Sequence, residues 1–375
     1  MNTSLNELKT PSLILDIDRV RVNAERMSKI VHRNGVRLRP HIKTHKCVEV
    51  AKIQTAGHDG AITVSTLAEA SAFAKHGFND ITYAVPIETG KFAEAVELRQ
   101  TGLELALLTD DAETAKALDD AAGKAGVKFS VFLKVDCGYH RCGVTPDTPD
   151  ALAIPRILSD ATNLLFAGIL THAGHSYDVK SVDGVREIAS IERDLMAGFA
   201  DLLRGDGIEV PTVSIGSTPT ISLADHLLGI DEVRPGNYIF YDAYQATLGS
   251  CRFEDCALEV LAAVIHRDPA RRRLVIDAGG IALSKDTGAR HLDPQCGYGR
   301  VRALDCHETG MRIAEVSQEH GEIDVDEQEI FDRFKVGDRV RVLANHSCLT
   351  AAQHSHYNVL ENDRIVDRWE IHRGW

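Results

Sequence analysis

The sequence lacks an apolar run long enough to span a bilayer, and its first residues, MNTSLNELKTPS, have neither a basic start nor an apolar core. We therefore expect a cytoplasmic protein without a signal peptide. The eight cysteines are scattered over 375 residues without the spacing of a disulfide framework, which predicts reduced thiols. The Cys-x4-Cys pairs at 137/142 and 251/256 are only weak evidence for a zinc site.

Positive charge is also scarce, since 42 Lys and Arg face 55 Asp and Glu, for a net charge of -13. Such an acidic chain is a poor partner for nucleic acid or an anionic membrane surface. Against this background the segment LRPHIKTHK, residues 38–46, gathers five side chains that are basic or can become so: Arg39, His41, Lys43, His45 and Lys46. Mutual repulsion makes the cluster costly unless an anion lies within it, so the segment predicts a pocket for a small anion.

The first two-thirds of the chain alternate between short β-branched runs and Ala-rich segments of helical periodicity. Eight strands are predicted, at 36–42, 61–65, 81–85, 103–108, 129–136, 166–172, 212–215 and 232–238. Helices are predicted between most of them, at 66–76, 91–98, 111–122, 147–158, 185–205 and 219–228. This count favours an α/β fold of the (β/α)8 barrel type over an open doubly wound sheet, with the barrel at residues 20–245.

The pattern changes after about residue 244, where strand-like segments follow one another with almost no helix. Residues 246–375 therefore predict a C-terminal all-β domain. The early segment TPSLILDIDRVRVNAERM could give that domain one more strand, so residues 1–19 are assigned to it.

Polar motifs fall where the predicted barrel strands end, which is where barrel enzymes carry their chemistry. They are RPHIKTHK, KVDCGYHRCG (134–143), THAGHSY (171–177), IGSTPT (215–220) and VRPGNYIFYD (233–242). Ser217 and Thr218 open a predicted helix, where free N–H groups and hydroxyls suit a phosphate, although a plain N-cap has the same sequence. Gly236 and Asn237, at the next strand end, could complete such a phosphate seat.

Lys43 stands among the cations of the first motif. Neighbouring positive charge and partial burial favour a neutral amine, as a Schiff-base lysine requires, although a basic surface turn would look alike. Together with a phosphate seat, Lys43 suggests an aldehyde cofactor that carries a phosphate, pyridoxal 5'-phosphate.

A second constellation is NHSC, in which His346 and Cys348 lie two residues apart. Along a strand these positions face the same side. Imidazole and thiolate suit Zn²⁺ better than Mg²⁺ or Ca²⁺, and two protein ligands leave positions open for water or substrate, as in a catalytic metal site. The alternative is a buried cysteine beside a turn histidine.

RPHIKTHK, ITVSTLAEA, GYHRCGV, THAGHSY, GSTPT, VRPGNYIFYD and NHSCLTAAQH together resemble the fold-type III pyridoxal-phosphate enzymes. More narrowly, the chain resembles the D-serine dehydratase and D-threonine aldolase-like group over nearly its whole length. The resemblance implies an alanine-racemase-like barrel with a β domain, assembled as a homodimer that completes each site between subunits.

By position in these motifs, the resemblance implies a role for each of several residues. Lys43 would form the Schiff base, and the phosphate would lie on Ser217, Thr218, Gly236 and Asn237. Arg141, Tyr177 and Tyr238 would line the cofactor ring, while Arg234 matches the residue that faces the ring nitrogen in racemases. His346 and Cys348 would hold a divalent metal, Zn²⁺ or else Mn²⁺ or Mg²⁺.

The implied substrate is a D-β-hydroxy-α-amino acid such as D-serine, D-threonine or a 3-hydroxyaspartate. The metal serves either α,β-elimination, giving a 2-oxo acid and ammonia, or aldol cleavage, giving glycine and an aldehyde. The His-x-Cys pair favours the dehydratase, and the aldolase is the alternative, with a histidine near the metal (His172, His175 or His320) as its base. A cofactor carrier would lack the β domain, and a racemase or a decarboxylase would have no use for the metal pair.

Overall fold

The computed structural model describes residues 3–375, and the chain divides into two compact units. The sheet unit contains the described residues up to Glu25 together with Asn237–Ile371. The barrel unit contains Arg26–Gly236 and His372–Trp375. The first division falls within helix α1 (Ile17–Asn34). Among residues 3–375, no helix combines the length and the hydrophobicity that crossing a bilayer requires.

The barrel unit is built on eight parallel strands, as the sequence predicts, in the order β2-β9-β8-β7-β6-β5-β4-β3. The strands are β2 (Arg37–Leu38), β3 (Ile62–Val64), β4 (Asp80–Pro86), β5 (Glu104–Thr109), β6 (Phe129–Lys134), β7 (Leu164–Leu170), β8 (Val213–Ile215) and β9 (Glu232–Val233). A parallel bridge between His41 and Thr63 joins the two ends of this sheet, with a 2.9 Å bond from the Thr63 N–H to the Pro40 carbonyl. The strands β2 and β9 are shorter than predicted, because the chain turns into 3-10 helix at Ile42–Thr44 and Asn237–Ile239.

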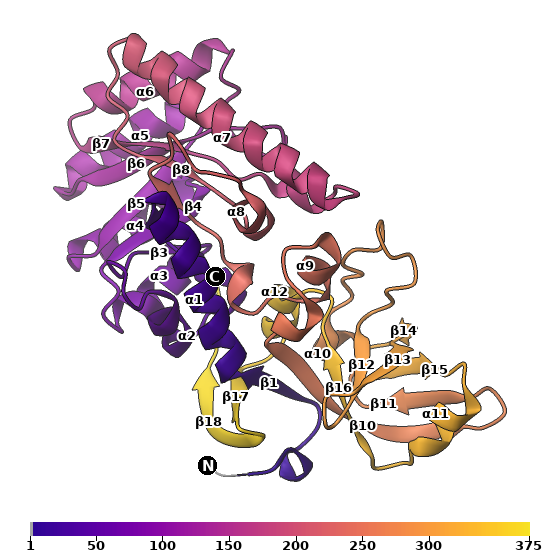
Figure 1. Cartoon of the computed structure of the whole chain (residues 1–375). Helices are drawn as coiled ribbons and strands as arrows, with labels where there is room; N and C mark the ends of the chain where they lie inside the picture. Colours follow the sequence, from indigo (N-terminus) through magenta and orange to yellow (C-terminus); the bar gives the residue numbers. More distant parts are fainter. Residues whose placement is uncertain (1–2) are drawn as a thin grey trace. The chain divides into compact units, whose positions relative to one another are not determined.

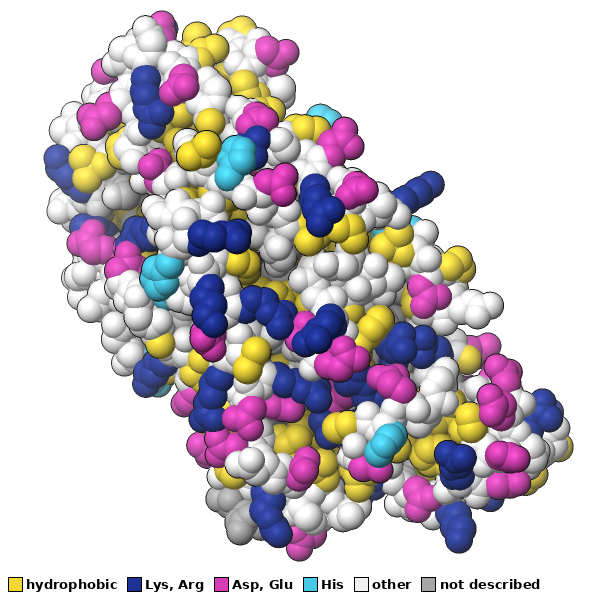
Figure 2. All heavy atoms as spheres, viewed as in Figure 1, with side chains coloured by type: hydrophobic (Ala, Val, Ile, Leu, Met, Phe, Trp, Pro, Cys, Tyr) yellow, Lys and Arg dark blue, Asp and Glu magenta, His cyan; other side chains and the backbone are white. Residues whose placement is uncertain are grey.

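Helices follow most of these strands, and α5, α6 and α7 lie outside β5–β8 in Figure 1. They are α2 (Val48–Gln54), α3 (Leu67–Ala74), α4 (Phe92–Gln100), α5 (Ala112–Ala125), α6 (Pro149–Asp160), α7 (Val182–Gly205) and α8 (Thr218–Leu223). Asp111, Ser181 and Ser217 begin their helices by accepting a backbone N–H at the third helical position. The face of the molecule in Figure 2 shows acidic and basic side chains interspersed over the barrel unit.

The second unit is mostly sheet, with ten strands whose main path is β13-β12-β16-β10-β1-β17-β18. They are β1 (Ser12–Asp16), β10 (Leu258–Asp268), β11 (Arg273–Ile276), β12 (Arg300–Ala303), β13 (Glu308–Arg312), β14 (Glu315–Val316), β15 (Gly321–Asp324), β16 (Arg339–Leu343), β17 (His356–Glu361) and β18 (Arg364–Glu370). As predicted, the early segment contributes a strand, because β1 pairs with β10 and β17. Short helices interrupt the sheet: α9 (Ala243–Leu248), α10 (Gly280–Leu283), α11 (Gln328–Arg333) and α12 (Ser347–Ala351).

The close approach of β7 and β8 depends on Gly168, whose φ is +123° and whose Cβ, if present, would lie 2.0 Å from the Thr212 carbonyl oxygen. Gly168→Ala should therefore lower the free energy of unfolding by about 2–4 kcal/mol, measured by urea unfolding. Gly198→Ala is the matched control, since it adds the same methyl group within α7, where a Cβ meets nothing within 4 Å. This control should stabilise by up to about 1 kcal/mol, and equal stability of the two variants would contradict the packing argument.

Candidate active site

Lys43 lies on a tight turn at the carboxyl end of β2. The 3-10 helix Ile42–Thr44 begins at His41, whose Nδ1 accepts the Lys43 N–H at 3.4 Å. The N–H groups of His45 and Lys46 both donate to the Ile42 carbonyl and close the turn. Lys43 therefore projects from a rigid backbone at the end of the barrel where such enzymes carry their chemistry.

The basic cluster of residues 38–46 divides into two groups in the structure. Arg39 is buried and bound to Glu232, with its Nε 2.6 Å from the carboxylate, and it also pairs with Asp80. Lys46 pairs with the buried carboxylate of Glu69. These two cations have anionic partners within the chain, so Arg39 and Lys46 serve the fold.

His41, in contrast, lies beside further positive charge. Burial lowers its pKa well below the usual value, and Lys43, Arg234 and His172 lower it further. Burial and the same Lys43 also lower the pKa of His172, at the end of β7. Both imidazoles are therefore neutral in this environment, and Lys43 and Arg234 lower the pKa of both.

Two more buried cations belong to this end of the barrel. Arg234 follows β9 and donates to the Ser214 hydroxyl at 2.6 Å and to the Thr171 carbonyl, and burial lowers its pKa to about 10. Lys134 ends β6, its Nζ donates to the Val135 carbonyl at 2.8 Å, and burial lowers its pKa. Positive charge held away from water in this way favours an anion that enters from outside the chain.

The loop after β6 carries Arg141 beside the same region. The Asp136 carboxylate accepts the N–H groups of Gly138, Tyr139 and His140, which fixes the loop. The Arg141 guanidinium lies 5.1 Å from the centre of the Tyr139 ring, and this ring meets His172 edge-on at 6.0 Å. Tyr177 ends the 3-10 helix Gly174–Tyr177, which follows β7.

Hydroxyl groups gather at the carboxyl ends of β7 and β8. Ser217 Oγ lies 3.1 Å from both Ser176 Oγ and Thr220 Oγ1, and Thr218 begins α8. Gly236 approaches from the end of β9, where an added Cβ would lie 2.6 Å from the His41 carbonyl oxygen. Small residues, hydroxyls and nearby buried cations are the chemistry that a phosphate group needs, so these residues fit the phosphate of the expected cofactor.

Glu192 is a buried residue of α7 that no sequence motif indicated. Its Oε1 accepts the N–H of Ala173 and that of Gly216, each at 3.1 Å. One carboxylate oxygen thus holds the loop after β7 against the loop after β8. Burial raises the pKa of Glu192, and its Oε2 has no hydrogen-bond partner among the described residues.

His346 and Cys348 lie at the start of a short helix, which corrects the prediction that they share one face of a strand. Strand β16 ends at Leu343, and His346 is the N-cap of α12. The chain turns here because Asp242 accepts both the N–H and the hydroxyl of Ser347, at 2.9 and 3.2 Å. The two side chains still interact: burial opposes protonation of His346, but Cys348 and Asp286 outweigh it and raise the pKa of His346 well above the usual value.

Asp286 orients the His346 ring. Its carboxylate lies 2.7 Å from His346 Nδ1, so Nδ1 carries a proton, and Nε2 is the nitrogen that a metal ion would bind after displacing the second proton. This carboxylate–histidine arrangement is the one that metal-binding histidines usually show, so the donor set fits a metal ion. Among residues 3–375, no group of three or more His, Cys, Asp and Glu side chains is arranged to hold a metal.

Asn237 and Tyr238 fall in the sheet unit, together with the His346–Cys348 turn. The Asn237 amide nitrogen donates to Asp242 at 2.7 Å and to Ser347 at 3.0 Å, and it lies 3.6 Å from Cys348 Sγ. The structure therefore brings the Asn237 side chain to the predicted metal pair. Tyr238 is fully buried.

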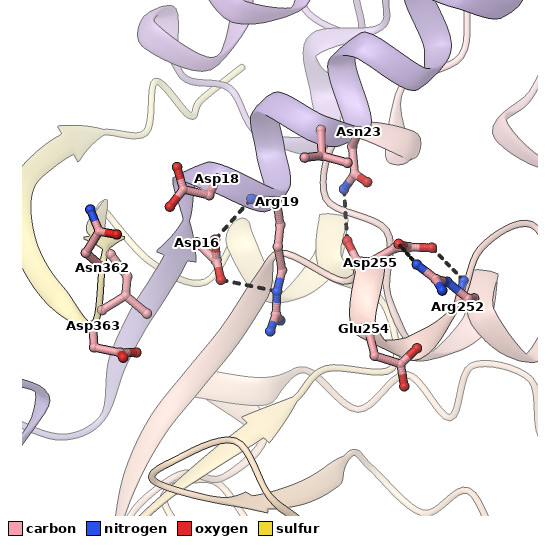
Figure 3. A pocket seen from close by; sticks show the side chains of 11 residues that line it. Asp16, Asp18, Arg19, Asn23, Arg252, Glu254, Asp255, Asn362 and Asp363 are labelled. Atoms are coloured by element: carbon pink, nitrogen blue, oxygen red, sulfur yellow. Dashed lines mark hydrogen bonds and ion pairs between the residues drawn. The ribbon is translucent and has the colours of Figure 1, made fainter.

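A cavity of about 430 Å³ in the sheet unit contains none of the predicted site residues. Figure 3 shows that charged side chains line it, among them Arg19 next to Asp16 and Arg252 next to Asp255. Each of these pairs joins residues three positions apart in the chain, and we assign the cavity no part in the candidate site.

Closed parallel strands with a lysine at one strand end, and a separate sheet unit, define the alanine-racemase-like class. The chain belongs to this family: the model for the alanine racemase N-terminal domain matches residues 15–243, and that for the Putative serine dehydratase domain matches residues 257–360. Within the class it is a fold-type III pyridoxal-phosphate enzyme of the D-serine dehydratase and D-threonine aldolase-like group, whose named members are lyases.

Relatives match the chain over its length. It is 39% identical to the D-threo-3-hydroxyaspartate dehydratase of Delftia sp. (strain HT23), over 100% of both chains, and 36% identical to the D-serine dehydratase of Dictyostelium discoideum, over 100% of this chain and 99% of that one. It is 28% identical to the 3-hydroxy-D-aspartate aldolase of Paracoccus denitrificans, over 98% and 92% of the two chains.

Solved structures agree with this assignment. The structure of the Delftia sp. HT23 dehydratase superposes with a TM-score of 0.96, at 39% identity, and covers 100% of both chains. A histidine-to-alanine mutant of D-threo-3-hydroxyaspartate dehydratase also gives 0.96, and a cysteine-to-alanine mutant in the metal-free form gives 0.95, at 39% and 40% identity. These two structures cover 100% and 99% of this chain and 98% and 100% of theirs.

Glu192→Gln should stabilise the protein increasingly as the pH rises. The pKa of Glu192 is raised on folding from an ordinary value of 4.5, so the wild type loses stability as the pH rises through the interval between the unfolded and folded pKa values. Glutamine does not titrate and keeps an oxygen for Ala173 and Gly216. The gain should reach about 1.4 kcal/mol for each unit of pKa difference, measured by urea unfolding at pH 5 and pH 8.

Glu187→Gln is the control for that experiment, because it removes a carboxylate from an exposed position of the same helix. A stability gain for Glu192→Gln that is equal at both pH values would show that the buried carboxylate does not titrate in this interval.

Proposed function

We propose that this protein is a dehydratase that acts on a D-β-hydroxy-α-amino acid by α,β-elimination, giving a 2-oxo acid and ammonia. The observation that carries the proposal is the His346–Cys348 turn with its orienting carboxylate Asp286, because a metal ion held there can act as a Lewis acid on a β-hydroxyl and make it a better leaving group. The relatives that support it are the D-threo-3-hydroxyaspartate and D-serine dehydratases, with 39% and 36% identity.

We assign the cofactor side of the reaction to the barrel unit. When bound, pyridoxal phosphate draws electron density away from the substrate α-carbon. Lys43 would hold the cofactor and then accept the α-proton on its Nζ. His41 and His172 are neutral beside Lys43, so they carry no negative charge that would hold its amine in the protonated form. The hydroxyls of Ser217 and Thr218, and the backbone at Gly236, would hold the phosphate.

Several further side chains would orient the substrate and the cofactor ring. Arg141, placed over Tyr139 at 5.1 Å, offers a guanidinium to the ring oxygen or to a substrate carboxylate. Tyr177 and Tyr238 would line the ring. Arg234 is held by Ser214 and Thr171, so its guanidinium is fixed rather than free to follow the substrate.

We assign the hydroxyl side of the reaction to His346 and Cys348, with Zn²⁺ as the proposed metal because imidazole and thiolate are its usual ligands. When bound, such a metal acts as a Lewis acid on the β-hydroxyl. Asp286 holds the His346 ring and Asp242 holds the backbone between the two ligands. In D-threo-3-hydroxyaspartate dehydratase, the histidine and the cysteine that were mutated lie two positions apart, which is the spacing found here.

The alternative function is an aldolase that gives glycine and an aldehyde, as the 28% identical 3-hydroxy-D-aspartate aldolase suggests. Its base would be a histidine such as His172, His175 or His320. We favour elimination because the D-threo-3-hydroxyaspartate dehydratase and the D-serine dehydratase with 39% and 36% identity are more similar to this chain than the aldolase is. We further propose a cytoplasmic homodimer.

Product analysis separates these functions. The purified enzyme is incubated with zinc and D-serine, D-threonine or either D-3-hydroxyaspartate, and ammonia with 2-oxo acid is assayed against glycine with aldehyde. Elimination predicts ammonia in equal amount to pyruvate, 2-oxobutanoate or oxaloacetate. Formation of glycine with an aldehyde would contradict the dehydratase proposal and support the aldolase.

Lys43→Ala should abolish the absorbance at about 420 nm that any pyridoxal Schiff base shows, because no amine remains at this position to form the Schiff base. Lys52→Ala is the control, since it removes an exposed lysine of helix α2 nine residues away, and it should keep the band. A band that persists in Lys43→Ala would remove Lys43 from its role.

Cys348→Ala should keep this band but lose bound metal, with content after dialysis falling at least about tenfold in elemental analysis, together with elimination. Cys251→Ala removes a thiol elsewhere in the sheet unit and should keep both. Undiminished turnover in metal-free Cys348→Ala would end the metal mechanism.

A further inference from the structure

The last four residues, His372–Trp375, group with the barrel unit, although the strands that precede them in the chain belong to the sheet unit. The His372 N–H donates a 2.7 Å hydrogen bond to the carbonyl of Lys46. The His372 ring lies against helix α3, where it meets Phe73 edge-on at 6.2 Å and His76 at 5.4 Å. Trp375 is 98% exposed, so the contact with the barrel is made at the start of this tail.

The residue that the tail reaches is conformationally unusual. Lys46 has a φ of +49°, in the left-handed region, which costs a residue with a side chain roughly 1–2 kcal/mol. Such a conformation persists only when the surroundings fix it. Lys46 is fixed at three atoms: its N–H donates to Ile42, its Nζ pairs with Glu69, and its carbonyl accepts from His372.

The turn that Lys46 closes is the one that carries Lys43. The bonds from His45 and Lys46 to the Ile42 carbonyl make residues 42–46 one rigid unit. The His372 bond fixes the peptide group through which the chain leaves this unit. Loss of that bond leaves the Lys46 carbonyl without this donor. The left-handed backbone conformation of Lys46, which ends the turn, is then less strongly fixed.

We propose that His372–Trp375 is a clamp that positions the Lys43 turn, through the hydrogen bond from the His372 N–H to the Lys46 carbonyl. His372 is thus a positioning residue, and the proposal rests on the proposed function of Lys43. The end of the chain determines the geometry of a lysine near its beginning, and so contributes to cofactor affinity without touching the cofactor.

His372→Pro and His372→Ala test the clamp as a matched pair. Proline removes the N–H, whereas alanine keeps the N–H and removes the ring. Two quantities are measured: the Kd of pyridoxal phosphate for the apoenzyme, and hydrogen exchange of the segment 42–47 in the apoenzyme. We expect His372→Pro to raise the Kd at least about fivefold and to speed exchange of the His45 and Lys46 amides, with His372→Ala within twofold of the wild type.

Deletion of residues 372–375 should reproduce the proline variant, and it replaces that variant if His372→Pro does not fold. Equal effects of proline and alanine would overturn the assignment to the N–H. Wild-type exchange and Kd in the proline and deletion variants would overturn the clamp itself, as would faster exchange with an unchanged Kd. Because hydrogen exchange of the apoenzyme needs no cofactor, its result stands apart from the Lys43→Ala test of the proposed function.

Discussion

Positive charge buried at one end of a barrel is the constraint on which the site depends. Lys134 and Arg234 are buried, and Lys43 depresses the pKa of both neighbouring histidines. Removing a charge from water is unfavourable unless an opposite charge compensates it. The chain compensates Arg39 and Lys46 with Glu232 and Glu69, and Glu232 and Glu192 also act on Arg234; we propose that an anion from outside the chain adds to this compensation around Lys43. The proposed phosphate cofactor and the substrate carboxylate supply that anion.

The loops that surround this charge are held by buried acceptors rather than by packing alone. Glu192 holds the loops after β7 and β8, and Asp136 holds the loop after β6. In the sheet unit, Asp286 and Asp242 hold the His346–Cys348 turn in the same manner. Each carboxylate fixes the orientation of a backbone segment or of a ring. A catalytic site needs its supporting residues to hold the reacting groups in such a defined orientation.

Sequence periodicity predicted the barrel well, because its eight strands are short apolar runs, and five of them lead into polar motifs. The same reasoning failed at His346 and Cys348, where a strand was predicted and a helix begins. The cause is Asp242, which lies 105 residues earlier and captures the Ser347 N–H, so no local pattern could reveal it. Glu192 was missed for the same reason, since one buried glutamate in a long amphipathic helix has no sequence signature.

The basic segment 38–46 shows what the sequence could predict and what it could not. It predicted a pocket for a small anion, but not that carboxylates of the chain itself would pair with Arg39 and Lys46. Only the closed barrel brings Glu232 beside Arg39, 193 residues away in the chain. The roles of Ser217, Thr218, Arg141, Tyr177 and Tyr238 toward the cofactor stay predictions that rest on resemblance and position.

The central claim is that this barrel end is built to hold pyridoxal phosphate on Lys43. The most direct measurement is reduction of the cofactor-loaded enzyme with borohydride, followed by peptide mass spectrometry. The account predicts a single phosphopyridoxyl group on Lys43. A label on Lys46 or Lys134 in its place, or none on an enzyme that retains its absorbance band, would contradict it.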